Sequence, residues 1–176
     1  GLGGIGGNDG QEMTISSIIS HIDTSGIKLV EITGGEPLLQ KETPFLIETL
    51  LKKNFSVLVE TNGSVDIDIV PSKAVIIMDL KCPGSGMSDR MKWENIEKLS
   101  GKDEIKFVIG DRRDYLWAVE KIRAYEVDKK SHILFSSVFG KLEPKTLVKW
   151  IMEDNLNVRF QLQLHKYIWG ADVKGV

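Results

Sequence analysis

The chain has 176 residues, a length that fits one domain able to bury roughly 70% of the surface of its unfolded chain. Its 23 lysines and arginines against 25 aspartates and glutamates give a formal net charge of −2, so it has no basic excess with which to bind nucleic-acid phosphates or an anionic membrane surface. Its apolar runs are far shorter than the ~20 residues that cross a bilayer. We therefore expect a cytoplasmic globular protein without nucleic-acid or membrane partners.

The chain divides into a short segment and one domain. Six glycines stand among the first ten residues, a composition that is flexible and does not pack. We expect residues 1–12 to form a flexible glycine-rich segment and residues 13–176 to form a single domain. The sequence contains one cysteine, Cys82, which excludes an internal disulfide and a cysteine-rich metal site.

Beyond residue 12, short β-branched runs alternate with longer segments of helical period. This alternation predicts an α/β fold in which parallel strands are joined by crossover helices. The strands are dense in Ile, Val, Leu and Phe, as strands buried on both faces would be. Strands are predicted over 28–32, 56–60, 74–79, 105–109, 132–136 and 158–162. Helices are predicted over 13–22 with Thr14 as N-cap, 43–53 with Thr43 as N-cap before Pro44, 93–99, 113–126 and 144–154.

The residues that could carry chemistry follow the C-terminal ends of these strands. Barrels and open α/β sheets place their ligand sites at that edge, because loops there vary over a rigid scaffold. The pattern therefore predicts one site along a single rim of the sheet. The segments concerned are Thr33-Gly-Gly-Glu-Pro37, Glu60-Thr-Asn-Gly63, Lys81-Cys-Pro-Gly-Ser-Gly86, Ser136-Ser-Val-Phe-Gly140 and Gln163-Leu-His165.

The first two rim segments each have a functional and a structural interpretation. Two glycines let a ligand approach the backbone closely, and the carboxylate of Glu36 suits a ligand ammonium group, although a plain strand-to-helix turn would look similar. Asn62 with Glu60 offers acceptors for a ribose, but Asn-Gly is also the strongest turn dipeptide.

The two lysines near the rim are also ambiguous. Lys81 can fix a carboxylate as a point charge. Lys106, which is flanked by apolar residues, must either reach a partner inside or point outward to solvent. Cys82 is interpreted as a small buried residue without reactivity.

The tail of the domain alternates polar and apolar residues with period two. Arg159, Gln161, Gln163 and His165 are therefore expected to share one face. Facing a barrel interior, this stripe would line a ligand pocket, and facing outward it would be a solvated surface.

Together these segments carry a resemblance to a known family. The Gly-Gly-Glu-Pro and Glu-Thr-Asn-Gly motifs resemble those of radical S-adenosylmethionine enzymes. Residues 79–86, 104–109 and 161–170 narrow the resemblance to the 7-carboxy-7-deazaguanine synthases, over about residue 12 to the end of the chain. The resemblance implies a partial, open parallel β/α barrel of about six strands. It also implies a lyase of queuosine biosynthesis that contracts 6-carboxy-tetrahydropterin to 7-carboxy-7-deazaguanine with loss of ammonia.

The resemblance further implies cofactors, partners and site residues. The cofactors are a 4Fe-4S cluster, S-adenosylmethionine and Mg²⁺, and the partners are a reductant such as flavodoxin or ferredoxin and a second copy in a homodimer. S-adenosylmethionine would be bound by Gly35, Glu36, Glu60, Asn62, Asp79, Leu80, Lys81, Ser136 and Ser137. The pterin would be bound by Thr33, Gln163, His165 and the terminal carboxylate of Val176.

The sequence departs from the family pattern at the metal sites. The family holds its cluster with three closely spaced cysteine thiolates and leaves the fourth iron for the nucleotide, and this chain has neither those cysteines nor the threonine that binds magnesium. We therefore expect this chain to be inactive without such a segment. The alternatives are another radical S-adenosylmethionine enzyme such as a glycyl-radical activating enzyme, a cluster-less nucleotide-binding protein, or an aldolase or isomerase that uses Lys106 or Lys81.

Overall fold

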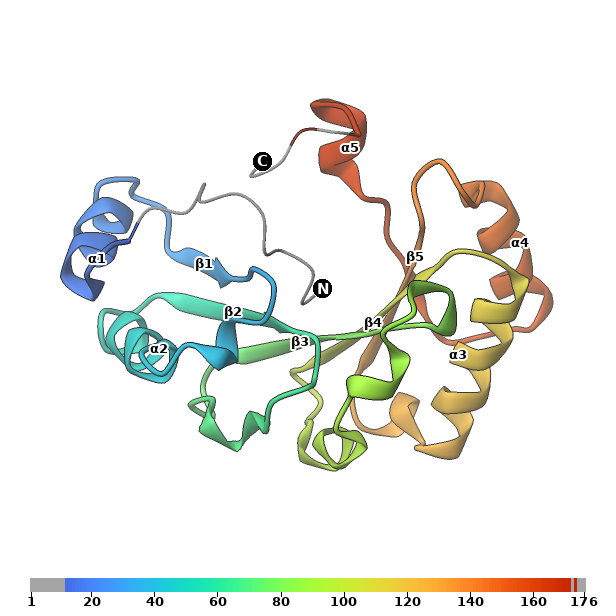
Figure 1. Ribbon diagram of the computed structural model, residues 1–176, viewed down its shortest axis with the longest axis horizontal. Coiled ribbons are helices and arrows are strands. Elements are labelled where there is room, and N and C mark those ends of the chain that lie inside the picture. The colour runs from blue at the N-terminus through green and yellow to red at the C-terminus, as the bar shows by residue number, and fades with distance from the viewer. Residues whose placement is uncertain (1–11, 172, 174–176) are drawn as a thin grey trace.

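The computed structural model describes residues 12–171 and residue 173 (Figure 1). The flexible segment predicted over 1–12 lies outside the described residues except for its last position, and so does the site residue Val176. The described chain forms one six-stranded sheet in the order β1-β2-β3-β4-β5-β6, and every neighbouring pair is parallel. The predicted open parallel α/β fold is confirmed.

The strands lie close to their predicted positions. The first five begin and end within one residue of the predicted bounds, because each is a short β-branched run that turn-forming residues delimit. The strands are β1 (Leu29–Ile32), β2 (Ser56–Thr61), β3 (Val75–Leu80), β4 (Glu104–Ile109), β5 (His132–Ser137) and β6 (Arg159–Phe160).

The sixth strand is shorter than predicted. The backbone N–H of Gln161 still donates to the carbonyl of Phe135 at 2.8 Å, but the N–H of Leu164 then donates back to the carbonyl of Leu162 at 3.0 Å. This turn leads into a short helix, α5 (Leu164–Ile168), that the sequence analysis did not predict. The period-two stripe over 159–165 is therefore wrong as an extended strand.

The helices follow the predicted order with small shifts in their bounds. The α-helices are α1 (Ile15–Asp23), α2 (Thr43–Lys52), α3 (Arg112–Ala124) and α4 (Pro144–Glu153), besides α5. The segment predicted as a helix over 93–99 is a 3-10 helix, η5. The 3-10 helices are η1 (Pro37–Leu39), η2 (Ile67–Ile69), η3 (Pro83–Ser85), η4 (Ser88–Arg90), η5 (Trp93–Lys98) and η6 (Val127–Lys129). Within the described residues, none of the helices has the length and apolar character needed to cross a bilayer.

The two predicted helix caps have different outcomes. Thr14 caps α1 as predicted, since its hydroxyl accepts from the N–H of Ser17 at 3.2 Å. Thr43 is wrong as the cap of α2, because Glu42 stands at the N-cap position. The hydroxyl of Thr43 donates instead to the carbonyl of Pro37 at 2.7 Å, which ties α2 to the preceding 3-10 helix.

The prediction of strands buried on both faces is wrong for β2 and β4, where burial alternates, but holds for β5, where residues 133–137 are all buried. In β4, Ile105, Phe107 and Ile109 are buried, whereas Glu104 and Lys106 between them are half-buried. Figure 1 shows α2 and α3 on one side of the sheet and α5 on the other. Alternation with period two thus gives each strand a core side and an open side that is free to form a site.

Candidate functional site

A cavity of about 350 Å³ lies on the open side of the sheet. We call it the larger cavity. It is lined by residues of β1 to β5 and of the segment after β6, and of the predicted rim segments Glu60, Ser136 and residues 163–165 reach it. Its lining residues include Glu31, Glu60, Glu104, Lys106, Leu134, Ser136, Gln161, Gln163 and His165.

A smaller cavity of about 270 Å³ adjoins it and shares Gln163 with it. This smaller cavity lies between the end of β5, the start of α4 and α5. Its lining is more apolar, with Phe139, Leu142, Leu162 and Tyr167 beside Ser137. The two cavities together offer one charged and one largely apolar compartment at the carboxyl ends of β5 and β6.

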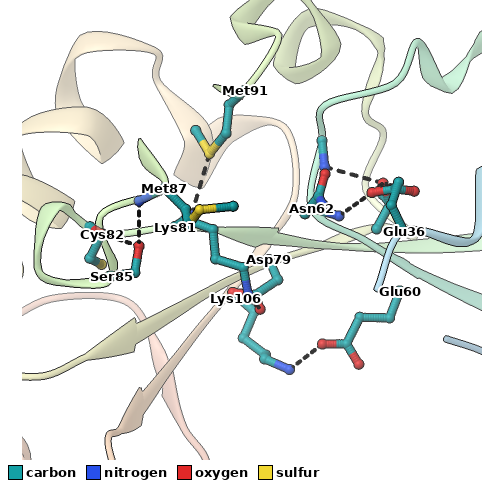
Figure 2. Close-up of polar contacts among 12 residues, drawn as sticks. Glu36, Glu60, Asn62, Asp79, Lys81, Cys82, Ser85, Met87, Met91 and Lys106 are labelled. Carbon is teal, nitrogen blue, oxygen red and sulfur yellow. Dashed lines mark hydrogen bonds and ion pairs between the residues drawn. The ribbon is translucent and has the colours of Figure 1, made fainter. Parts of the chain in front are cut away.

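Glu36 joins the turns that follow β1 and β2. Its buried carboxylate accepts hydrogen bonds from the N–H of Leu38 at 3.1 Å, the hydroxyl of Thr61 at 2.8 Å and the N–H of Asn62 at 2.8 Å (Figure 2). The preceding Gly34 has a φ of 144°, in a region that favours glycine. The motif is thus a turn after β1 whose carboxylate also fixes the turn after β2. The same turn can hold a ligand.

Asn62 and Gly63 form the turn that the sequence also suggested. The side-chain oxygen of Asn62 accepts from the N–H of Ser64 at 2.9 Å. Gly63 has a φ of 73°, and a Cβ there would lie 3.2 Å from the sulfur of Met78. The backbone conformation therefore favours glycine at this position, and a Cβ there would also require the Met78 side chain to shift.

Lys106 points into the larger cavity, which decides the alternative that the sequence left open. Its Nζ lies 2.5 Å from Oε1 of Glu60, and both side chains are half-buried (Figure 2). Burial works to lower the pKa of Lys106, but the hydrogen bond and charge of Glu60, with Asp79 and Glu31, outweigh it and raise the pKa. Burial and the neighbouring charge of Glu60 raise the pKa of Glu31.

Asp79 near the end of β3 forms a second ion pair with Lys81, which directly follows that strand. Asp79 is buried, and its Oδ1 has no hydrogen-bond donor among the described residues. The same holds, within the described chain, for Oε1 of Gln163. A buried acceptor without a donor is costly unless something else supplies one, so these two oxygens are suited to a ligand that carries N–H or O–H groups.

The remaining predicted site residues differ in their exposure. Ser136 is buried at the larger cavity and Ser137 at the smaller one. Leu80 has its side chain in the core, so only its backbone can contact a ligand. Thr33 and Gly35 are exposed at the rim and line neither of these two cavities.

Three of the four polar residues of the predicted stripe line the larger cavity. They are Gln161, Gln163 and His165, the last from α5 rather than from a strand. Arg159 is largely exposed and does not line the cavity, but it forms an ion pair with Glu104, which does, and it is level with Leu134 in the register, so it lies on the same open face.

Two cavity residues, Glu31 and Glu104, were missed by the sequence analysis. Glu31 is level in the register with Leu58, which stands two residues before Glu60 on β2. Glu104 is level with Ile77, which stands two residues before Asp79 on β3. That periodicity is the signal that could have found them.

The described residues do not form a metal site. No group of three or more His, Cys, Asp or Glu side chains among them is arranged to hold an ion. Burial, together with the charges of Asp114 and Asp79, raises the pKa of the Cys82 thiol. With one cysteine in the sequence, the residues of this chain do not fit an iron–sulfur cluster, which needs several thiolates.

Comparisons with known proteins give close relatives and several structural neighbours. No protein-family model matches the chain. It is 41% identical over 186 residues to the 7-carboxy-7-deazaguanine synthase of Koribacter versatilis, covering 97% of this chain and 81% of that protein. It is 40% identical over 170 residues to the protein of the same name from Chlorobaculum tepidum, covering 95% and 77%.

One structural neighbour has the same fold. The crystal structure of QueE from Escherichia coli superposes with a TM-score of 0.68 at 21% identity, covering 86% of this chain and 64% of that chain. The consecutive parallel strands thus belong to a fold that the solved QueE structure shares.

Proposed function

We propose, because this chain belongs to the 7-carboxy-7-deazaguanine synthase family, that its open cavity binds S-adenosylmethionine and 6-carboxy-tetrahydropterin. The reaction would be the radical contraction of the pterin to 7-carboxy-7-deazaguanine with loss of ammonia, a carbon–nitrogen lyase step of queuosine biosynthesis. The observation that carries the proposal is the charged cavity on the open face of the sheet, together with the buried oxygens of Asp79 and Gln163 that have no donor among the described residues.

The charge of the cavity supports a cationic nucleotide. Glu31, Glu60 and Glu104 line it with one lysine, Lys106. S-adenosylmethionine carries a sulfonium and an ammonium group, and both are stabilised by nearby carboxylates. When bound, the nucleotide would provide the radical that takes a hydrogen atom from the pterin, after a reductant has given one electron to its sulfonium.

The residues of this chain would position the nucleotide along the rim. The backbone at Gly35 and the turn held by Glu36 would receive the methionyl part, and Glu60 with Asn62 the ribose. Asp79 would accept from ligand donors at its unpaired oxygen. The backbone of Leu80, with Lys81, Ser136 and Ser137, would complete the nucleotide site.

The pterin would lie toward the tail. Gln163 and His165 both line the larger cavity and offer an amide and an imidazole to the polar edge of a pterin. Thr33 would contact it from the end of β1. Val176 stays a prediction outside the described residues.

The residues of this chain would bind and position both ligands, but they do not fit an iron–sulfur cluster. We propose that the chain by itself does not turn the pterin over. Magnesium, a flavodoxin or ferredoxin reductant, a homodimer and a cytoplasmic location are proposed from the family resemblance.

Titration calorimetry of S-adenosylmethionine and of the pterin, each against the chain, tests the proposal. We expect both to bind, and we expect His165→Asn to weaken pterin binding by about tenfold, the worth of a hydrogen bond to a buried partner, with nucleotide binding unchanged. Failure of both ligands to bind the parent chain would contradict the proposal.

An imine-forming aldolase or isomerase is the second candidate. Imine formation needs a neutral lysine amine, whereas Lys106 is paired with Glu60, which raises its pKa, and Lys81 is paired with Asp79. Borohydride in the presence of small aldehydes is therefore expected to trap no adduct on either lysine, and a trapped adduct would favour this candidate instead.

A further inference from the structure

The ion pair between Lys106 and Glu60 crosses one strand of the sheet. Glu60 is on β2 and Lys106 on β4, so the contact of 2.5 Å passes over the intervening β3. In the register, Ile77 of β3 is opposite Glu60 and Asp79 is opposite Lys106. Neighbouring strands are about 4.8 Å apart, so two extended side chains are needed to close this gap.

The pair stands in the larger cavity and not in the core. The two side chains retain 23% and 25% of their accessible surface, and both line the cavity. An ion pair at this depth adds little to stability, because solvent still reaches it. The same contact also holds the Glu60 carboxylate in one position.

The other charged groups on this face have their own partners or none. Asp79 is paired with Lys81, and Glu104 with Arg159. Glu31 lines the cavity from β1 beside Glu60, and His165 faces it from α5. Within the described face, Lys106 thus has an ion pair with Glu60, and the charges of Asp79 and Glu31 also act on it.

We infer that Lys106 is a positioning residue of the nucleotide site: through its ion pair it fixes the Glu60 carboxylate toward the ligand and offsets the charge of Glu31. The inference deepens the proposed function and rests on it for the ligand. Lys106 acts through Glu60 and does not itself contact the nucleotide.

The first test measures S-adenosylmethionine affinity by calorimetry in the full chain, in four test variants and in one control variant. Lys106→Met removes the charge at similar length, Lys106→Arg keeps it, Glu60→Gln removes the partner, and the double variant removes both. Lys149→Met is the matched control, because it deletes a lysine charge from the exposed face of α4. Circular dichroism checks that each variant is folded.

We expect Lys106→Met to weaken binding by about tenfold, as loss of a charge-assisted hydrogen bond would. Lys106→Arg should bind within about threefold of the parent, and Lys149→Met like the parent. The double variant should bind no more weakly than Glu60→Gln alone, because Lys106 acts through Glu60. Additive losses would overturn the inference in favour of direct contact, and an unchanged affinity in Lys106→Met would overturn it altogether.

A second measurement does not depend on the ligand. Carboxyl-carbon NMR follows the titration of Glu31 and Glu60 in the ligand-free parent and in Lys106→Met. Without the cation, two neighbouring carboxylates cannot both stay ionised as readily, so the pKa of at least one should rise. If both titrate as in the parent, the positioning function of Lys106 is contradicted. If the parent binds no nucleotide, the proposed function fails, and this titration still decides whether Lys106 controls Glu60.

Discussion

The two faces of the sheet are built from alternate residues of the same strands, yet different forces hold them. On the core face, Ile105, Phe107 and Phe135 are buried and make apolar contacts with the helices. On the open face, Lys106 and Glu60 are joined by charge across an intervening strand. Apolar packing depends on size and shape alone, whereas the open face depends on which charges meet.

The comparison teaches that one strand can serve stability and chemistry independently. Neighbouring residues on β4 differ by one position in sequence but lie on opposite sides of the sheet. Substitutions on the core face should therefore change the free energy of unfolding, and substitutions on the open face should change ligand affinity. The predictions below test this division.

Phe107→Ala is expected to have the largest effect on stability. Phe107 is fully buried and lies edge-on to Phe135 and Trp117, with ring centroids 5.5 Å and 6.3 Å away. Truncation leaves a cavity, so the free energy of unfolding should fall by about 3–5 kcal/mol in urea denaturation. Lys106→Met next to it should cost less than about 1 kcal/mol. Equal losses in the two variants would refute the division between faces.

Glu36→Ala is expected to affect both properties, because Glu36 belongs to the site and is buried. Removing the carboxylate leaves the hydroxyl of Thr61 and the N–H of Asn62 without their acceptor, at a cost of about 1–3 kcal/mol. Nucleotide affinity should also fall in calorimetry. Glu42→Ala is the matched control, because Glu42 makes no side-chain capping bond. An unchanged affinity in a folded Glu36→Ala variant would remove Glu36 from the nucleotide site.

Two carboxyl groups, Asp103 directly before β4 and Glu31 on β1, should change the pH dependence of stability with opposite signs. Burial works to raise the pKa of Asp103, but hydrogen bonds from Lys102, Ile76 and Ser100 hold it below its ordinary value of 3.8. Its contribution to stability is present above pH 3.8 and is lost as the pH falls through the folded-state pKa. The pKa of Glu31 is raised above 4.5, so its contribution is present below that value and is lost as the pH rises through the folded-state pKa.

Urea denaturation across the acid range measures both effects. Asp103→Asn should lower stability at neutral pH by about 1–2 kcal/mol, since charged hydrogen bonds are lost, and should flatten the fall in stability toward acid. Glu31→Gln should remove the opposite slope. If Asp103→Asn left the acid slope unchanged, the hydrogen-bonded carboxylate would not be what limits acid stability.

Most of the sheet could be predicted from the sequence, because its strands are local runs that turn-forming residues bound. The motifs after β1 and β2 also lie where the sequence placed them, since chain order and parallel pairing bring strand ends to one edge. The orientation of Lys106 could not be predicted, because its partner Glu60 is remote in sequence and two strands away. The path of the tail was wrong for a similar reason: Lys166 and Tyr167 of α5 contact Phe139 in the segment after β5, and no local period encodes these contacts.

Cys82→Ala should have the smallest effect, although the cysteine stands in a rim segment. Its thiol is buried, and burial raises its pKa, so little thiolate is present at neutral pH to react or to bind a metal. The variant should bind S-adenosylmethionine like the parent and lose about 1 kcal/mol of stability or less, the worth of a small buried group. A thiol reagent should modify the parent only as fast as the chain unfolds. Rapid labelling of the native chain would show instead that the loop after β3 opens to solvent, and the rim there would then be less fixed than the core face beneath it.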